Sequence, residues 1–226
     1  MSPIDVAANL RAVQESIAAA CRRAGRAPAE VLLIGVSKTV DLDRIRAAIA
    51  AGVPALGENR VQEAKDKVEA LGRPVPWHLI GSLQTNKARD AVHLFDCIHS
   101  VDRLELAREI DRRAQAVGRA IEGLLQVNLG DEPQKGGLAE DDFERLRDDC
   151  AALSHLRIVG LMAIPPHTEE AEGARPYFKR LRALRDALGL PHLSMGMSAD
   201  YAIAIEEGAT MVRVGTSVFG PRERPA

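Results

Sequence analysis

The sequence predicts a (β/α)8 TIM barrel with one extra N-terminal helix, formed by residues 1–226 as a single domain. Short apolar runs alternate eight times with stretches of helical periodicity. Strict alternation of strands and helices is typical of a parallel sheet, and eight units suit its closure into a barrel. No Pro/Ser-rich linker divides the sequence, and the eight units use almost all of it. Because periodicity does not show closure, an open doubly wound sheet is the alternative architecture.

The predicted elements follow one another in a regular order. The first is an amphipathic helix that ends at Gly25 and Pro28, with an apolar face formed by Val6, Leu10, Val13, Ile17 and Cys21. The strands are short aliphatic runs, expected at residues 31–37, 54–58, 77–81, 96–100, 121–128, 157–164, 192–197 and 211–215. The helices between them carry apolar residues at three- and four-residue spacing, from Leu42, Ile45 and Ile49 after the first strand to helix 199–207 before the last.

The composition limits the classes of function. Hydrophobic residues make up 46% of the chain and aromatic residues only 3%, so we expect an aliphatic core. A net charge of −2 argues against nucleic acid or an anionic membrane as the main partner. No stretch of the sequence approaches the roughly 20 apolar residues that are needed to span a bilayer.

The N-terminal residues and the cysteines indicate the cytoplasm. Acidic and basic residues stand near the N-terminus, where a signal peptide needs an apolar core. Cys21, Cys97 and Cys150 are odd in number, widely spaced and in no metal-ligand pattern. We therefore expect reduced thiols and a cytoplasmic protein.

Lys38 is the most informative residue. It ends the apolar run Val31-Leu-Leu-Ile-Gly-Val-Ser-Lys38, which has the length and composition of a buried strand. An amine at the end of a buried strand is costly unless it is solvated or used in chemistry. The sequence therefore favours a functional lysine at this position.

Other polar or small residues also follow the predicted strands. The carboxyl ends of barrel strands form one rim, where the chemistry of such barrels is found. Here these ends supply Lys38, Asn59, Gly81-Ser82, Ser100, Asn128, Ser198 and Gly215-Thr216. Ser, Asn and Gly are also ordinary strand exits and helix caps, so each of them has a purely structural alternative.

Two neighbouring loops are suited to binding a phosphate. Gly215-Thr216 after the last strand offers backbone N–H groups and a hydroxyl, and Ser198 stands in the loop before helix 199–207, which it is placed to cap. Barrels often bind phosphates at the loops after strands seven and eight. An amine and a phosphate site on one rim suit a phosphorylated aldehyde held as a Schiff base, and pyridoxal 5′-phosphate is the leading candidate. Two ordinary strand-to-helix turns are the alternative.

Arg213 is expected to point into the barrel. It lies in the last strand two residues before Gly215, so both residues share one face of that strand. A buried arginine needs an acceptor. We consider two partners, a buried carboxylate such as Glu58 and the ring nitrogen of the cofactor.

Two further groups are weaker candidates. His78 and His99 lie in or near the third and fourth strands, but no third ligand has the spacing of a metal site, so we expect core or rim histidines. Lys135 lies in the Gly-rich loop 133–137 and could reach the rim, although a solvated loop lysine is the simpler interpretation.

Five segments together resemble one known family. They are Val36-Ser-Lys-Thr39, Gly57-Glu-Asn-Arg-Val-Gln-Glu63, Trp77-His-Leu-Ile-Gly-Ser-Leu-Gln-Thr-Asn-Lys87, Ser194-Met-Gly-Met-Ser198 and Val212-Arg-Val-Gly-Thr-Ser-Val-Phe-Gly220. In this order they are similar to the YggS/PROSC family of pyridoxal-phosphate-binding homeostasis proteins. The resemblance covers nearly the whole chain, from the first helix to about Phe219.

The resemblance implies a barrel similar to the N-terminal domain of alanine racemase. It implies that Lys38 forms the Schiff base, that Arg213 faces the pyridine nitrogen, and that Asn59 lies near the ring. It further implies a phosphate site made of Ser198, Gly215 and Thr216. Lys135 matches a family lysine that often precedes Ser-Gly, but Gly136 replaces that serine here.

We expect a monomeric carrier of pyridoxal phosphate that lacks robust catalysis and passes the cofactor transiently to apo PLP-dependent enzymes. Racemisation on this cofactor needs a base on each face of the ring and an electron sink through a protonated pyridine. Lys38 could serve one face, the tyrosines Tyr177 and Tyr201 fall in predicted helices, and Arg213 would keep the ring nitrogen unprotonated. The alternatives are a weak amino-acid racemase, a Schiff-base aldolase acting on a phosphorylated sugar, and a purely structural barrel.

Overall fold

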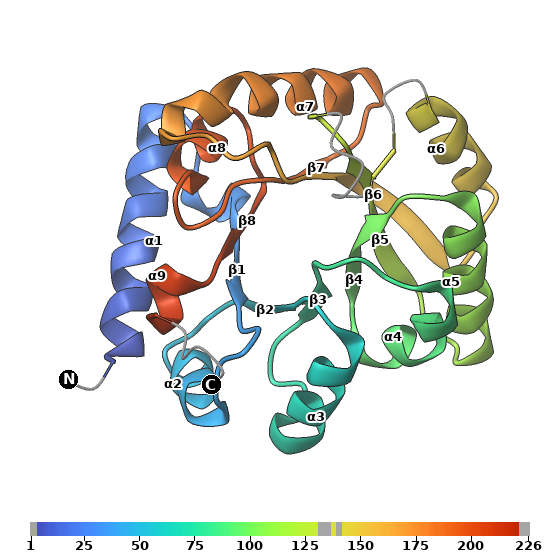
Figure 1. Cartoon of the computed structure of the whole chain (residues 1–226), viewed down its shortest axis with the longest axis horizontal. Helices are drawn as coiled ribbons and strands as arrows, with labels where there is room; N and C mark the ends of the chain where they lie inside the picture. Colours follow the sequence, from blue (N-terminus) through green and yellow to red (C-terminus); the bar gives the residue numbers. More distant parts are fainter. Residues whose placement is uncertain (1–3, 131–136, 139–141, 222–226) are drawn as a thin grey trace.

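The fold is a closed parallel barrel surrounded by helices (Figure 1). The computed structural model describes residues 4–130, 137–138 and 142–221. Eight strands pair in chain order, and the last pairs with the first along Leu32–Gly35 and Met211–Val214. This return closes the sheet, so the predicted barrel is confirmed and the open doubly wound sheet is wrong.

The strands lie where the apolar runs predict them. They are β1 (Leu32–Val36), β2 (Ala55–Glu58), β3 (Trp77–Leu79), β4 (Cys97–Val101), β5 (Ile121–Val127), β6 (Leu156–Ala163), β7 (His192–Ser194) and β8 (Met211–Val214). The largest difference is at β7, which was expected to continue to residue 197 but ends at Ser194. The residues after these shortened strands lie in the loops that form the rim.

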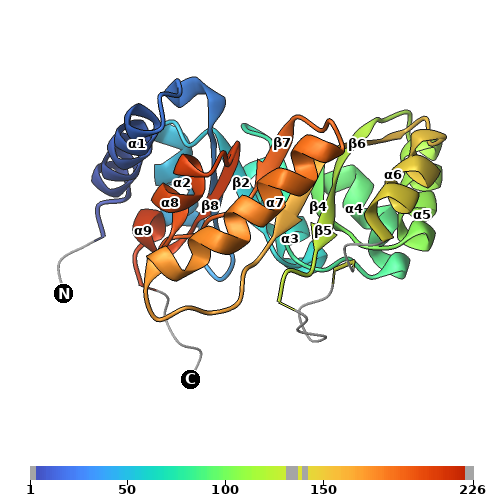
Figure 2. The ribbon, with the colours of Figure 1, turned by 90° about the horizontal axis from the view of Figure 1, so that it is seen from above.

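Helices cover the outside of the barrel (Figures 1 and 2). They are α1 (Val6–Arg23), α2 (Leu42–Ala50), α3 (Val61–Leu71), α4 (Ala88–Leu94), α5 (Leu104–Ala116), α6 (Phe143–Ala151), α7 (Arg175–Ala187), α8 (Tyr201–Glu206) and α9 (Thr216–Phe219). The extra helix α1 packs beside α8 and α9, with its predicted apolar face buried. None of the helices in the described part of the chain is long and apolar enough to cross a membrane.

Two apolar clusters form the core. The larger one fills the space between the strands and the helices. The smaller one lies among the inward-facing side chains of the barrel and consists of Ile34, Ala55, Cys97, Leu124, Val159, Met162 and Met211. Polar side chains, including His78, His99, Ser194 and Arg213, are also buried. Because alternate residues of a strand face inward, these polar groups share the interior with the smaller cluster.

Candidate functional site

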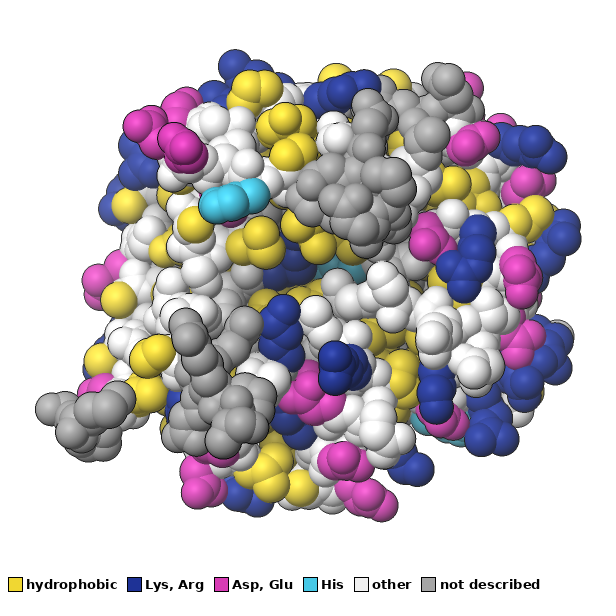
Figure 3. Space-filling view, in the orientation of Figure 1, with side chains coloured by type: hydrophobic (Ala, Val, Ile, Leu, Met, Phe, Trp, Pro, Cys, Tyr) yellow, Lys and Arg dark blue, Asp and Glu magenta, His cyan; other side chains and the backbone are white. Residues whose placement is uncertain are grey.

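All six residues proposed from the sequence line one cavity at the carboxyl ends of the strands. The cavity has a volume of about 360 Å³ and is lined by Val36, Lys38, Asn59, Ile80, Ile164, Met197, Ser198, Ala199, Arg213, Gly215 and Thr216. Figure 3 shows a hollow near the centre of the barrel face, with Lys and Arg side chains in and beside it. Residues from β1 and β8 and from the loops after β1, β2 and β7 therefore converge on one place.

Two larger hollows lie at the amino-terminal ends of the strands, on the face of the barrel opposite this cavity. One, of about 500 Å³, includes the first residues of β5 and β6, Ile121 and Leu156. The other, of about 490 Å³, includes His192 at the start of β7 and Thr210 just before β8. In barrels of this kind the amino-terminal ends of the strands serve stability, whereas chemistry is found at the carboxyl ends. The smaller cavity around Lys38 is therefore the better candidate despite its size.

Arg213 is a buried cation with fixed partners. Its side chain points inward, as the alternation predicts, and the residue is 3% exposed. Nη1 donates hydrogen bonds to the carbonyl oxygen and the hydroxyl of Ser194, at 2.7 and 2.6 Å, and Nη2 donates to the carbonyl of Ala163 at 2.9 Å. Burial lowers the pKa of Arg213 to about 10, so the guanidinium is still charged at neutral pH. These contacts hold it rigidly beside the cavity.

Of the two partners considered for Arg213, the ion pair with Glu58 is wrong. Glu58 is fully buried, but it pairs with Lys67 at 2.8 Å and accepts a hydrogen bond from the Ser37 hydroxyl at 2.6 Å. Successive residues of a strand face opposite sides. Since the neighbouring Asn59 lines the cavity, Glu58 points away from it, toward α3.

Ser198 does not cap a helix, contrary to expectation. The helix α8 begins at Tyr201, and the side chain of its N-cap residue Asp200 accepts instead from the Met197 N–H at 2.6 Å. The Ser198 hydroxyl accepts from the Gly215 N–H at 3.3 Å. The loops after β7 and β8 are thereby joined at the cavity wall, next to Thr216.

A close backbone approach places Asn59 on the rim. A β-carbon built on Gly81 would lie 2.3 Å from the carbonyl oxygen of Asn59, so only glycine fits there. The Ser100 hydroxyl donates to the Gly81 carbonyl at 2.8 Å and is therefore part of this packing. Lys135 falls outside the described residues.

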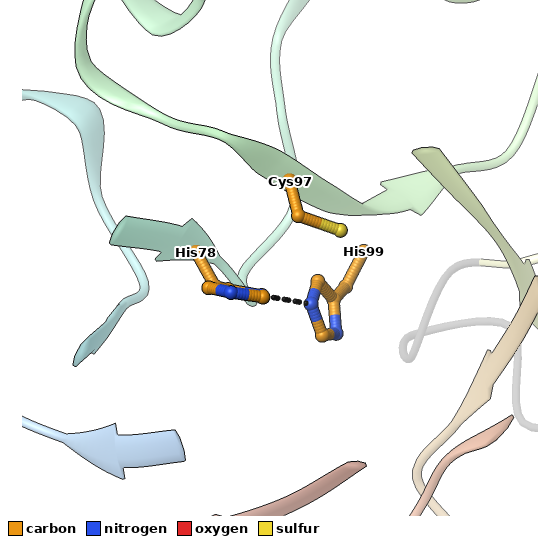
Figure 4. A group of neighbouring side chains, drawn as sticks. All are labelled: His78, Cys97 and His99. Carbon is orange, nitrogen blue, oxygen red and sulfur yellow. Dashed lines mark hydrogen bonds between the residues drawn. The ribbon is translucent and has the colours of Figure 1, made fainter. Parts of the chain in front are cut away.

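The sequence missed a buried group of side chains that supports Arg213. His78 on β3 and His99 on β4 lie against each other, with His78 Nδ1 2.9 Å from His99 Nε2 (Figure 4). The Cys97 side chain is the third member, because the ligand atoms of all three lie within 4.8 Å of one another, although no third residue has the sequence spacing of a metal site. The other ring nitrogen, His99 Nδ1, lies 2.9 Å from the Ser194 hydroxyl.

The hydrogen bonds in this group run in one direction, from Arg213 through Ser194 and His99 to His78. Arg213 can only donate, so Ser194 Oγ accepts from it and can donate its own proton to His99 Nδ1. His99 then carries its proton on Nε2 and donates to His78 Nδ1. The facing nitrogens, His99 Nε2 and His78 Nδ1, are thus used in a hydrogen bond. Burial raises the pKa of the Cys97 thiol far above its ordinary value, which disfavours the thiolate that would bind a metal. We therefore interpret the group as a hydrogen-bonded chain behind Arg213 and not as a metal centre.

The buried histidines should make stability depend on pH. Burial lowers the pKa of His78 to about 4. The unfolded chain, with a histidine pKa of about 6.5, then binds more protons between these values, so the free energy of unfolding falls as the pH is lowered through this window. We expect His78 to account for a loss of about 2 kcal/mol between pH 7.5 and pH 5, measured by urea unfolding.

Two substitutions check this origin. The His78→Gln variant should lose much of the pH dependence, whereas His93→Gln, at an exposed position of α4, should keep it. An unchanged pH dependence in His78→Gln would contradict the assignment.

Comparison with known proteins places this geometry in a family. The family model for the N-terminal domain of alanine racemase matches residues 8–223. The pyridoxal phosphate homeostasis protein of Aquifex aeolicus is 46% identical over 221 residues, which cover 95% of this chain and 97% of that protein. The protein of the same name from Escherichia coli K12 is 41% identical over 230 residues and 97% of each chain.

Solved structures agree with the sequence comparison. PipY of Synechococcus elongatus, with PLP bound, has a TM-score of 0.85 and 39% identity, covering 95% of this chain and 100% of that chain. Alanine racemase of Clostridium difficile has a TM-score of 0.71 at 16% identity, covering 98% of this chain and 57% of that chain, which shows a shared fold alone. Together, the long, closely related matches show that this chain belongs to the family of pyridoxal phosphate homeostasis proteins.

Proposed function

We propose that this protein binds pyridoxal 5′-phosphate as a Schiff base on Lys38 and holds it for intracellular homeostasis and delivery. The observation that carries the proposal is the convergence of Lys38, Arg213 and the Ser198–Gly215–Thr216 group on one cavity. The family membership supports the same ligand, since PipY is described with PLP bound.

The cavity has the chemistry that this cofactor needs. Its volume of about 360 Å³ lies in the range of roughly 300–1,000 Å³ that is typical of small-molecule sites. Lys38 supplies an amine for the aldehyde, and Ser198 and Thr216 supply hydroxyls for the phosphate. Two N–H groups of Arg213, on Nε and Nη2, are not engaged by Ser194 or Ala163 and suit a ring nitrogen that accepts a hydrogen bond.

The same residues favour holding the cofactor over catalysis. Bound pyridoxal phosphate supplies an electron sink, which is strongest when its ring nitrogen is protonated. Arg213 is a cation that only donates, so it disfavours a second positive charge on the ring. Among the described residues that line the cavity, Lys38 is the one side chain suited to act as a base. Tyr177 and Tyr201 pack against the core and do not line the cavity.

Lys38 is expected to be the site of attachment. Borohydride reduction of the protein with pyridoxal phosphate, followed by peptide mass mapping, should place the adduct on the peptide that contains Lys38. The Lys38→Ala variant should lose the imine absorbance. If that absorbance persists, another lysine such as Lys135 forms the linkage and the assignment is wrong.

Thr216 is expected to contribute to phosphate binding. Thr216→Val keeps the shape of the side chain but removes a hydroxyl donor, which is worth about 1 kcal/mol or more against a charged acceptor. Titration should show binding of pyridoxal phosphate weakened several-fold, with binding of pyridoxal unchanged. Ser217→Ala is the matched control, because Ser217 is also exposed but does not line the cavity. Equal affinity of the unmodified protein for both vitamers would falsify the phosphate assignment.

The protein is expected to act as a carrier. Loaded protein should transfer pyridoxal phosphate to an apo PLP-dependent enzyme while racemising alanine no faster than the free cofactor. Arg213→Glu should favour protonation of the pyridine nitrogen and raise the rate at which alanine exchanges its α-proton with solvent. Arg213→Gln, which removes the positive charge without adding a carboxylate, should raise that rate less. Robust racemase turnover that depends on Lys38 would instead establish the alternative, a PLP-dependent amino-acid racemase.

A further inference from the structure

The turn directly after Lys38 has an unusual backbone conformation. Thr39 has φ of 60°, and among the described residues it is the one non-glycine residue with positive φ. This region is disfavoured for L-residues, and more so for a β-branched side chain such as threonine. Thr39 is exposed, so packing of its side chain does not impose the conformation. Contacts to its backbone must hold it.

The Val40 N–H closes the turn by donating to the Ser37 carbonyl at 3.0 Å, and a pair of residues on α3 makes further contacts to its backbone. Glu63 Oε1 accepts a hydrogen bond from the Thr39 N–H at 2.5 Å. Lys67, one helical turn later, donates from Nζ to the same Glu63 oxygen at 2.7 Å and to the carbonyl of Ser37 at 2.6 Å. Glu63 therefore binds the residue after Lys38, and Lys67 binds the residue before it. We call Glu63 and Lys67 the α3 clamp.

Burial makes the clamp strong and specific. The Lys67 side chain is 7% exposed, and its third donor bond goes to the buried Glu58 at 2.8 Å, so all three of its N–H groups are used. The second oxygen of Glu58, Oε2, has no hydrogen-bond partner among the described residues. Glu58 thus depends on Lys67, and an ammonium with three fixed acceptors leaves little freedom for the backbone that it binds.

We infer that Glu63 and Lys67 are positioning residues that fix the backbone on both sides of Lys38 and so direct its amine into the cavity. The inference rests on the proposed function of Lys38. The simpler possibility is an ion cluster that only fastens α3 to the barrel. The two differ in one respect, because only a positioning role makes the effect of Glu63 depend on the conformational preference of residue 39.

A double-mutant cycle between Glu63 and Thr39 separates these possibilities. Lys67 is left intact, because its removal would strip the buried Glu58 of its cation. Glu63→Met removes the acceptor of the Thr39 N–H, so Thr39 can relax to negative φ, and pyridoxal phosphate binding at Lys38 should weaken about tenfold. Glycine adopts positive φ without penalty, so Glu63→Met should cost much less in a Thr39→Gly background. Glu63→Gln keeps an acceptor oxygen for the Thr39 N–H, so it should weaken pyridoxal phosphate binding less than Glu63→Met does.

Hydrogen exchange of the unliganded protein tests the clamp without the cofactor. The Thr39 amide should exchange about tenfold faster in Glu63→Met, whereas Glu69→Met, at an exposed position of the same helix, should change neither exchange nor binding. Equal costs of Glu63→Met with Thr39 and with Gly at position 39, or an unchanged Thr39 amide, would overturn the inference. If the unmodified protein does not bind pyridoxal phosphate on Lys38, the proposed function fails and the positioning role fails with it, even where faster exchange shows that the clamp itself exists.

Discussion

The candidate site depends on one buried cation, the guanidinium of Arg213. A charge inside a barrel is tolerated only when its hydrogen-bonding groups are satisfied. Here the acceptors come from Ser194 on β7 and Ala163 on β6. The pairing of β6 with β7 and of β7 with β8 brings these acceptors beside Arg213. The cation in turn sets the direction of the hydrogen bonds through Ser194 to His99, because a guanidinium never accepts.

A second buried cation, Lys67, occupies the other side of the barrel wall. Arg213 faces the interior and lines the cavity, whereas Lys67 lies between β2 and α3 with Glu58. Both cations bind backbone carbonyls, Arg213 those of Ser194 and Ala163 and Lys67 that of Ser37. The chain thus uses buried charge to fix backbone near the cavity from two directions, which aliphatic packing alone would do with less directional precision.

The sequence predicts the barrel and the rim residues well because both follow from local patterns. Asn59 and Gly215 each follow directly on a strand and Lys38 lies two residues after one, and the ends of parallel strands must meet. Of the two partners considered for Arg213, the Glu58 alternative is wrong, and alternation along β2, which places Glu58 and Asn59 on opposite faces, could have excluded it. The chain from Arg213 to His78 could not be predicted, since it joins residues of four strands through the register of a closed sheet. The α3 clamp left a detectable signal, an i,i+4 Glu63–Lys67 pair, but its backbone partners did not.

The hydrogen-bonded chain behind Arg213 and the α3 clamp behind Lys38 would affect a bound cofactor in different ways. The chain behind Arg213 is neutral beyond the guanidinium, because burial lowers the pKa of His78 and of His99 well below the neutral range. It therefore offers the cavity no proton at physiological pH. The clamp behind Lys38 constrains geometry, because it binds backbone on either side of the lysine and leaves the amine to the cavity. Under the proposed function, one support withholds the proton that carbanion chemistry would use, and the other keeps the amine in place for attachment. That combination suits a protein that retains its ligand unchanged until another protein takes it.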